Sequence, residues 1–321
     1  MKINIYHSII YNFLLKTYQL RNKQSFLGKC WLLLWNYSSK NFSGAVSTTI
    51  HGYNVKVNNG NSYALYARLF PNYNNPLLQL VDSVYELYNR ELSIIDIGSA
   101  VGDTNLFLIK NLPGKIEKFY CVEGDFEFFE YLEENKKYFP KSFLFNVLLS
   151  ESDNNKINSL VKTHLGTASA IGDEKVKTIS LDTLLFDKLN GRVDIIKIDV
   201  DGLDGRILKG TEKILKYYKP FVIFEWHPIM IKKTQNDFHE HFEILGKFGY
   251  NRFLWFNKYG DFSHFGLVED YLNREELIKL CLRNLYDYDW HYDIIAIHSE
   301  SEIDILKIAE LKTAKSKQSR F

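Results

Sequence analysis

The feature that most constrains the fold is a segment in which an apolar run meets two glycines four residues apart. Residues 92–97 are predicted to form a buried strand that enters a turn containing Gly98 and Gly102, and a helix is expected to start near Asp103. Gly98 allows a tight turn with close backbone approach, and Gly102 lets the helix pack near the strand. The unpaired N–H groups at the start of that helix would face whatever occupies the crevice.

The next predicted strand, residues 118–122, is followed by an acid at the position where a nucleoside-binding site would need one. Glu123 follows Gly102 by about 20 residues, a position from which a carboxylate can accept hydrogen bonds from both hydroxyls of a ribose. Taken alone, the turn is equally typical of a structural strand–helix connection. The acid alone is equally typical of a solvated loop. Their combination favours a ligand of the nucleoside type.

The residues around the glycines distinguish between nucleoside-containing cofactors. A dinucleotide-binding turn needs a glycine where this chain has Ala100, and Asp103 would place a carboxylate beside the pyrophosphate. Both residues argue against NAD and FAD. Asp96, on the strand before the turn, instead fits a cofactor that carries an ammonium group and a sulfonium.

From residue 92 onward, strand-like and helix-like segments alternate. This rhythm predicts an α/β fold with a mostly parallel sheet and helices on both faces, in one catalytic domain over residues 91–311. Further strands are expected at residues 142–149, 193–198, 221–224, 252–256 and 292–298, and helices at 181–189, 202–218, 238–248 and 274–284.

The N-terminal part follows a different pattern. Residues 1–47 are predicted to be a helical extension and residues 48–90 a β-hairpin and a helix, with strand-like alternation over 48–57 and a turn at 58–61. The scattered apolar residues of 1–37 fit either a helix packed on the main domain or a basic amphipathic helix in peripheral contact with a membrane. Their longest apolar run is far short of the roughly 20 residues of a transmembrane segment.

Composition restricts the partners and the setting. The 40 basic and 39 acidic residues give a net charge of +1, without the basic surplus that is typical of nucleic-acid-binding proteins. The three cysteines are far apart and show no metal-binding spacing, and no signal peptide is recognisable, which favours a reduced, cytoplasmic setting. Residues 312–321 are expected to form a basic, flexible tail. The oligomeric state is left open.

Two later strands end in acids and a histidine. In a parallel sheet the carboxyl ends of the strands share one edge, so Asp199, Asp201, Glu225 and His227 are expected to converge near the glycine turn. Glu225 or His227 is a candidate general base, and Asp199 is a candidate for orienting the amino-acid end of the cofactor. One alternative is that Asp199, Asp201 and Glu225 hold a divalent ion, and another is that Asp201 and Asp204 cap a helix.

A pair of histidines resembles a metal site but has the wrong spacing. His239 and His241 are two residues apart, which places them on different faces of a predicted helix. Both are therefore expected to be solvated.

In the glycine turn, the strand ending in Glu123 and the acidic ends of the later strands, the chain resembles the FkbM family of S-adenosylmethionine-dependent methyltransferases. The resemblance extends over roughly residues 48–230, and its most specific block is residues 197–210. Asp201 and Asp204 depart from the family pattern, because Glu is usual at both positions. The matching segments are residues 95–104, 122–123, 146–150, 179–184, 194–202, 208–210 and 220–225.

The resemblance implies a Rossmann-like class I methyltransferase fold with S-adenosylmethionine as the cofactor. It also implies O-methylation of a sugar or another small polar acceptor, in polysaccharide or glycan biosynthesis. By position, Asp96, Gly98, Gly102 and Glu123 correspond to cofactor contacts, and Asn146 to a neighbour of the adenine. Asp103, at the start of the predicted helix, is a further candidate cofactor-binding residue. N-methylation of a small molecule, and a non-catalytic module within a glycan-biosynthesis assembly, are the alternatives.

Overall fold

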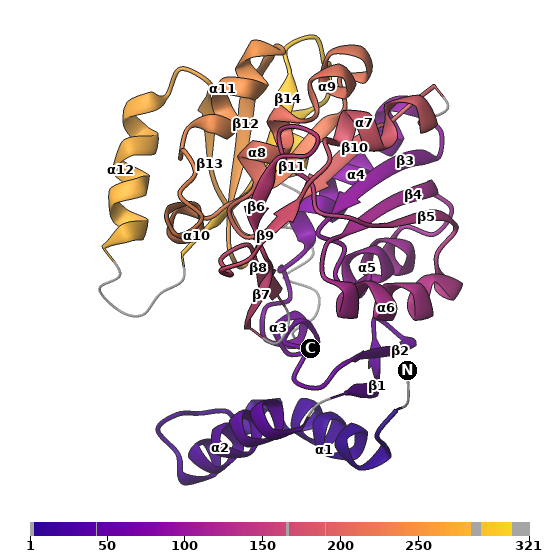
Figure 1. The fold of residues 1–321 in the computed structure, drawn as a ribbon, viewed down its shortest axis with the longest axis vertical. Coiled ribbons are helices and arrows are strands. Elements are labelled where there is room, and N and C mark those ends of the chain that lie inside the picture. Colours follow the sequence, from indigo (N-terminus) through magenta and orange to yellow (C-terminus); the bar gives the residue numbers. More distant parts are fainter. Residues whose placement is uncertain (1–2, 43, 165–166, 190, 284–289, 310–321) are drawn as a thin grey trace.

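An eight-stranded sheet forms the centre of the molecule (Figure 1). The computed structural model describes residues 3–42, 44–164, 167–189, 191–283 and 290–309. The strands of this sheet are β3 (Leu92–Ile97), β4 (Ile116–Glu123), β5 (Lys141–Asn146), β10 (Ile195–Ile198), β11 (Phe221–Trp226), β12 (Tyr250–Asn257), β13 (Phe262–Leu267) and β14 (Tyr292–His298). Their order across the sheet is β13-β12-β14-β11-β10-β3-β4-β5.

Most of the sheet is parallel, and the antiparallel strands lie at one side. β5, β4, β3, β10 and β11 pair in parallel, whereas β14 is antiparallel to both β11 and β12, and β13 is antiparallel to β12. Because Glu225 of β11 pairs with Asp293 of β14, the start of β14 lies at the same edge as the carboxyl ends of the parallel strands. This sheet, with helices on both faces, confirms the predicted Rossmann-like class I methyltransferase fold.

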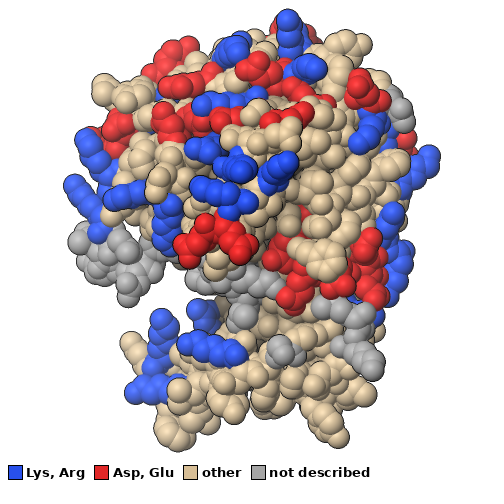
Figure 2. All heavy atoms as spheres, in the orientation of Figure 1, with Lys and Arg blue, Asp and Glu red and all other residues tan. Residues whose placement is uncertain are grey.

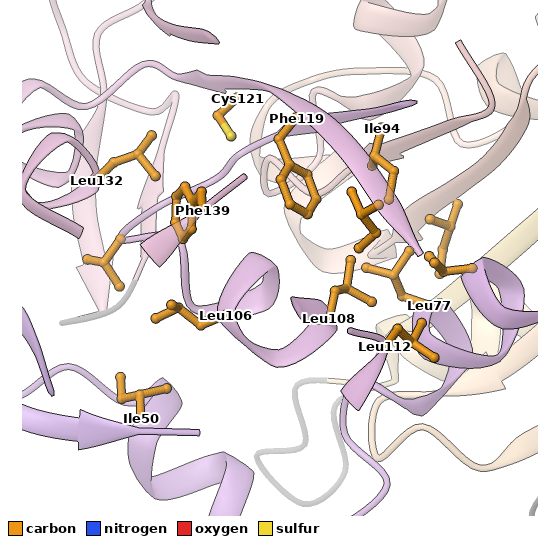
Figure 3. Packing of buried hydrophobic residues seen from close by; sticks show 14 of the residues in the cluster. Ile50, Leu77, Ile94, Leu106, Leu108, Leu112, Phe119, Cys121, Leu132 and Phe139 are labelled. Atoms are coloured by element: carbon orange, nitrogen blue, oxygen red, sulfur yellow. The ribbon is translucent and has the colours of Figure 1, made fainter. Parts of the chain in front are cut away.

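Successive residues of the central strands point to opposite faces of the sheet, and each face has its own hydrophobic core. Ile94 and Phe119 belong to one core, part of which is shown in Figure 3. Ile95 and Tyr120 belong to the other. The first face is covered by α4 (Asn75–Tyr88), α5 (Asp103–Asn111) and α6 (Phe126–Asn135), and the second by α7 (Leu181–Leu185), α8 (Asp204–Lys209), α9 (Glu212–Tyr218) and α11 (Glu240–Lys247).

The N-terminal extension contains two helices, which Figure 1 shows below the α/β body. They are α1 (Ile5–Lys16) and α2 (Phe26–Asn41), and the hairpin of β1 (Ala45–Ile50) and β2 (Tyr53–Asn58) connects them to α3 (Tyr63–Leu69). Asn135 of α6 holds the hairpin on the body, because its side chain accepts a hydrogen bond from the Lys56 amide at 3.1 Å and donates one to the Lys56 carbonyl at 2.9 Å.

Two expected elements are wrong in detail. The helix predicted over 202–218 is two helices, α8 and α9, which meet at Gly210, where a Cβ would lie 2.3 Å from the carbonyl oxygen of Ser150. The strand predicted over 48–57 is also wrong. The chain reverses at His51 and Gly52, whose φ angles of 51° and 88° form the hairpin turn.

Several short elements were not predicted. They are α10 (Pro228–Lys233), β13, the pair β6 (Lys156–Asn158) and β9 (Lys175–Lys177), and the pair β7 (Val161–His164) and β8 (Thr167–Ser169). The helix predicted over 274–284 corresponds to α12 (Tyr271–Leu282), and the last residue of that prediction lies outside the described residues. The predicted tail, residues 312–321, also lies outside them.

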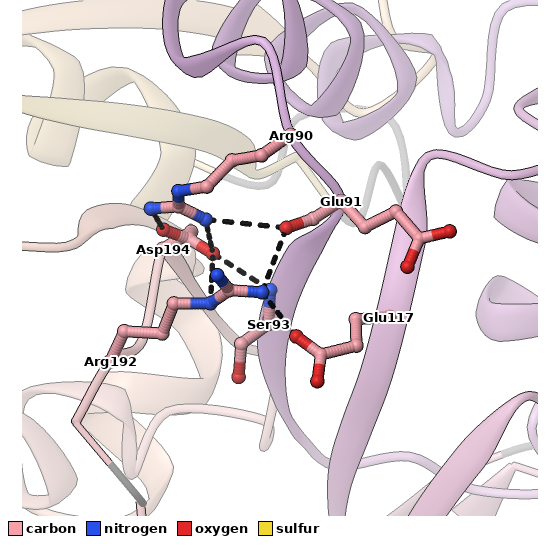
Figure 4. Close-up of polar contacts among 6 residues, drawn as sticks. All are labelled: Arg90, Glu91, Ser93, Glu117, Arg192 and Asp194. Atoms are coloured by element: carbon pink, nitrogen blue, oxygen red, sulfur yellow. Dashed lines mark hydrogen bonds and ion pairs between the residues drawn. The ribbon is translucent and has the colours of Figure 1, made fainter.

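At the edge opposite the carboxyl ends of the parallel strands, a buried carboxylate joins two neighbouring strands (Figure 4). Asp194 accepts hydrogen bonds from both terminal nitrogens of Arg90, at 2.6 and 3.0 Å, and from the amide of Ser93 at 2.8 Å. Arg192 extends the network to Glu117 of β4. These contacts fix the starts of β3, β4 and β10 relative to one another.

Two remaining observations concern the redox state of the cysteines and the length of the helices. Cys30, Cys121 and Cys281 are all free thiols. Within the described residues, no helix has both the length and the apolar character needed to cross a bilayer.

Candidate active site

A cavity of about 930 Å³ lies at the carboxyl edge of the parallel strands. Its volume is at the upper end of the roughly 300–1,000 Å³ typical of ligand sites, enough for a nucleoside cofactor together with an acceptor. Of the sequence-predicted site residues, Asp96, Gly102 and Asn146 are not among those that line the cavity. Those that do line it are Gly98, Asp103, Glu123, Asp199, Asp201, Glu225 and His227.

The glycine turn brings β3 into contact with the end of β10. Gly98 has a φ of 76°, and a Cβ at this residue would lie 1.9 Å from the carbonyl oxygen of Asp199. Only glycine permits this close approach. Gly102, with a φ of 83°, has a packing role instead, since a Cβ there would lie 2.3 Å from Cζ of Phe139.

Glu123 is held against the turn by two backbone amides. Its Oε2 accepts a hydrogen bond from Ala100 at 2.8 Å, and its Oε1 accepts one from Asp125 at 2.7 Å. Burial raises the pKa of Glu123 to about 7, although both amide donors oppose the increase. Each carboxylate oxygen keeps a further lone pair, so the group can still accept hydrogen bonds from ligand hydroxyls.

Asp96 is paired within the protein. Nζ of Lys197 lies 3.1 Å from Oδ1 of Asp96 and 3.5 Å from Oδ2 of Asp199, and it donates to the carbonyl of Gly98 at 3.2 Å. The interpretation of Asp96 as the partner of a cofactor cation therefore needs correction, because Lys197 supplies the nearby positive charge. The carboxylate of Asp199, whose side chain is 51% exposed, lies at the cavity instead.

Asp103 is a second buried carboxyl group at the cavity. It opens α5, and its Oδ1 accepts a hydrogen bond from the Thr104 amide at 2.8 Å. Burial raises its pKa to about 7, while the charge of Lys197 acts in the opposite direction. A cationic ligand next to Asp103 would favour the ionised carboxylate.

Asn146 supports the end of β4. Its side-chain amide donates to the carbonyl of Glu123 at 2.9 Å. The cavity is lined in this region by Val147, Leu148 and Leu149, the residues that follow Asn146. These apolar side chains suit the faces of an aromatic base.

Glu225, at the end of β11, is largely buried, and one of its carboxylate oxygens has no hydrogen-bond partner among the described residues. That oxygen is Oε2, and Oε1 lies 3.4 Å from Nε2 of His291. Burial, followed by the charges of Asp199, Asp201 and neighbouring carboxylates, raises the pKa of Glu225 well above its ordinary value. Such a carboxyl group is a stronger proton acceptor than an ordinary glutamate.

His227 begins α10, where it has a structural contact. Its Nδ1 accepts a hydrogen bond from the Met230 amide at 3.4 Å, so in the neutral ring the proton is on Nε2. The ring stacks on His291, with 4.9 Å between the ring centroids. His227 therefore lines the cavity as a hydrogen-bond donor when neutral.

His291 and Asp293 were not predicted as site residues. Both line the cavity, because β14 is antiparallel and its first residues meet the carboxyl edge of the parallel strands. The signal in the sequence was a histidine directly before the final predicted strand.

Neither Asp201 nor Asp204 provides a side-chain N-cap for α8, as one alternative expected. The N-cap residue is Leu203, and no side chain caps the helix. Asp201, with a φ of 51°, accepts a hydrogen bond from the hydroxyl of Ser169 at 3.0 Å. Asp204 is completely buried and accepts one from the Gly202 amide at 3.2 Å.

Two further expectations concerned a metal site and the histidine pair His239 and His241. No group of three or more His, Cys, Asp or Glu side chains within the described parts of the chain is arranged to hold a metal ion. The prediction that His239 and His241 are solvated is wrong, since both are buried. His239 contacts Glu275 at 2.7 Å, and His241 stacks on Phe224.

Aromatic side chains form the wall of the cavity next to Glu225 and Asp199. Phe70 and Tyr259 have ring centroids 4.5 Å apart, and the hydroxyl of Tyr63 accepts a hydrogen bond from Asn74 at 2.6 Å. We call this group the aromatic wall, and its members are Tyr63, Tyr66, Phe70, Tyr73 and Tyr259. Burial and the nearby carboxylates raise the pKa of Tyr73 well above its ordinary value, so its hydroxyl stays protonated.

A family model for the methyltransferase FkbM domain matches residues 44–252, which include the glycine turn, Glu123 and Glu225. The chain belongs to the FkbM methyltransferase family. This FkbM protein is accordingly an S-adenosylmethionine-dependent methyltransferase. No curated protein sequence matches the chain.

The solved structures that match part of this chain include other methyltransferases. The methyltransferase FkbM of Methylobacillus flagellatus KT is 14% identical, with a TM-score of 0.35, over 64% of this chain and 43% of that one. The precorrin-6y C5,15-methyltransferase of Geobacter metallireducens GS-15 is 12% identical, with a TM-score of 0.35, over 68% and 87%. The plantazolicin methyltransferase BamL, in complex with a desmethylPZN analogue and SAH, is 12% identical, with a TM-score of 0.40, over 73% and 88%.

The residues at the cavity of this FkbM protein fit S-adenosylmethionine. Glu123 can accept hydrogen bonds from the two ribose hydroxyls, and the side chains after Asn146 suit the adenine. Asp103 and Asp199 line the same cavity and would supply negative charge for the ammonium and sulfonium groups. When bound, the cofactor supplies a methyl group attached to a positively charged sulfur.

Proposed function

We propose that this protein transfers a methyl group to a hydroxyl of a sugar, or of a related small polar acceptor, in polysaccharide or glycan biosynthesis. The observation that carries the proposal is Glu225, a largely buried carboxyl at the cavity, 12% exposed, with one oxygen near His291 and the other without a partner among the described residues. A hydroxyl is a weak acid, so its methylation benefits from a positioned proton acceptor. The cytoplasmic setting expected from the free cysteines is part of this proposal.

The aromatic wall supports a sugar as the acceptor. Rings such as those of Tyr66 and Tyr73 present apolar faces against which a sugar ring can stack, while tyrosine hydroxyls bind its polar groups. The protonated hydroxyl of Tyr73 lies among carboxylates and can donate a hydrogen bond to an acceptor oxygen.

In the proposed reaction the acceptor hydroxyl transfers its proton to Glu225, which shares it with His291. The acceptor oxygen forms a bond to the methyl carbon as the carbon–sulfur bond breaks, and the electrons of that bond remain on sulfur. The protein's main contribution is to align the oxygen with the methyl group. Asp199, at the end of β10, orients the amino-acid end of the cofactor from the exposed side of its ion pair with Lys197.

Glu225→Gln tests this assignment, because glutamine keeps the shape of the side chain but is not a base. Formation of S-adenosylhomocysteine is measured with a panel of cell-envelope sugars and sugar nucleotides. We expect kcat to fall by about 10²–10⁴-fold, the usual contribution of a general base, while cofactor affinity stays nearly unchanged. Glu302→Gln, at an exposed residue, is the matched control.

The other outcomes separate the alternatives. Undiminished turnover in Glu225→Gln would remove Glu225 as the base. Turnover with amines but with no hydroxyl acceptor would favour N-methylation. Tight cofactor binding without turnover on any acceptor would favour a non-catalytic module.

A further inference from the structure

The helices α1 and α2 use their inner surfaces to hold the N-terminal extension together. Tyr11, Leu14 and Trp31 are at most 4% exposed, and the indole of Trp31 donates to the carbonyl of Leu14 at 3.2 Å. The hydroxyl of Tyr11 donates to the carbonyl of Asn61 at 2.8 Å. A helix that only packs on a domain buries one apolar stripe and presents polar residues on its other side.

The outer surfaces of these two helices are apolar as well. At about 100° per residue, the exposed apolar residues of α1 lie within an arc of about 100°. They are Ile5, Tyr6, Ile9 and Phe13, with exposed fractions of 70, 79, 61 and 58%. The corresponding exposed residues of α2 are Phe26, Leu27, Leu33, Leu34 and Tyr37. We call these nine residues the N-terminal apolar face.

The charge around this face has one sign. Residues 1–81 contain eight lysines and arginines but no aspartate or glutamate, so the near-zero net charge of the whole chain hides a separation of charge. Lys16 lies within the apolar arc of α1, and Lys29 lies beside that of α2. Figure 2 shows blue side chains and no red ones at the end formed by α1 and α2, and the outermost surface there is tan.

We propose that the N-terminal apolar face docks on a lipid bilayer surface that carries anionic headgroups. Apolar side chains on one side of a helix, flanked by lysines, are typical of helices that lie in the membrane interface. The aliphatic parts of such lysines contact the apolar layer while their ammonium groups reach the headgroups. Anionic lipid attracts the basic extension, and this attraction decays within a Debye length.

The charge distribution favours a bilayer over a second copy of the chain. A symmetric dimer through this face would bring two extensions together, each with basic and no acidic residues. Like charges at such an interface repel one another. An anionic surface complements both the apolar and the basic parts of the extension.

Co-sedimentation of the full chain with vesicles tests the proposal. The vesicles consist of phosphatidylcholine alone or of phosphatidylcholine mixed with phosphatidylglycerol. We expect binding to the anionic vesicles to be at least about 10-fold stronger and to weaken when salt rises from about 0.1 M to about 1 M. The double variant Leu33→Ser/Leu34→Ser should lower binding by about 10-fold or more, because it removes apolar contact.

Matched variants control for exposure and charge. Leu272→Ser changes a leucine of α12 that is 79% exposed and should leave vesicle binding unchanged. Lys16→Glu/Lys29→Glu should abolish the preference for anionic vesicles, whereas Lys216→Glu, an exposed residue of α9, should retain it. An unchanged heat of S-adenosylmethionine binding shows that each variant is folded.

Three outcomes overturn the proposal. The first is that the wild-type chain does not bind anionic vesicles, and the second is that the Leu272→Ser control loses binding as much as the α2 variant. The third is that the wild type is a dimer by sedimentation velocity and Leu33→Ser/Leu34→Ser is a monomer, which would assign the face to a contact between copies.

Discussion

The ammonium group of Lys197 lies 3.1 Å from the carboxylate of Asp96, and both side chains are buried behind the glycine turn. Burial alone would lower the pKa of Lys197, but Asp96 and Asp199 raise it above its ordinary value, so the lysine stays charged. The pair links β3 to β10 at the point where the cavity begins.

Lys197→Met should destabilise the protein by about 3–5 kcal/mol, because it leaves the Asp96 charge buried without its partner. The double variant Asp96→Leu/Lys197→Met should recover most of this loss. Urea denaturation of the three proteins measures the difference. A loss below about 1 kcal/mol in the single variant would mean that Asp96 does not depend on Lys197.

Glu123→Ala should weaken S-adenosylmethionine binding by at least about 10²-fold. The variant removes an acceptor for two ribose hydroxyls, and each hydrogen bond to a charged group contributes about 1.5–3 kcal/mol. Isothermal titration calorimetry measures the affinity. Glu133→Gln, an exposed residue of α6, should bind as tightly as the wild type. Equal affinities in the two variants would contradict the ribose assignment.

Asp103 should make the protein less stable as the pH rises. Burial raises its pKa from 3.8 to about 7, so the folded state holds a proton that the unfolded state loses at lower pH. This contribution is complete below the unfolded pKa and is lost as the pH rises through about 7. Asp103→Asn keeps the acceptor for the Thr104 amide, so its Tm should fall less between about pH 5 and pH 8 than that of the wild type.

His227→Ala should cost about 1 kcal/mol of stability, the usual contribution of an N-cap, because Nδ1 accepts from the Met230 amide. His227→Asn should restore much of that stability, since asparagine is a preferred N-cap residue. Turnover should fall less in both variants than in Glu225→Gln. If His227→Asn is stable and binds the cofactor but loses turnover as completely as Glu225→Gln, His227 is the base instead.

The sequence identified the parts of the site that depend on local order. A strand, the Gly98 turn, a helix and the strand ending in Glu123 follow one another directly, so their register along the chain predicted their contact in space. The convergence of Asp199, Glu225 and His227 followed from the parallel strands.

Contacts across long separations could not be read from the sequence. Asp96 looked available to a ligand because its partner, Lys197, follows on a strand that pairs with β3 only after folding. His291 was missed because its position depends on β14 being antiparallel. His239 and His241 are both buried because α11 has contacts on two sides, with Glu275 of α12 on one and Phe224 of β11 on the other.

The helix α2 has two different surroundings, since Trp35, Asn36, Ser39 and Lys40 line the cavity while Leu33 and Leu34 face outward. Removing α2 from the chain would therefore remove part of the cavity wall together with the outward-facing leucines. The N-terminal extension therefore contributes to the wall of the cavity itself, and a tilt of α2 would change the width of the cavity.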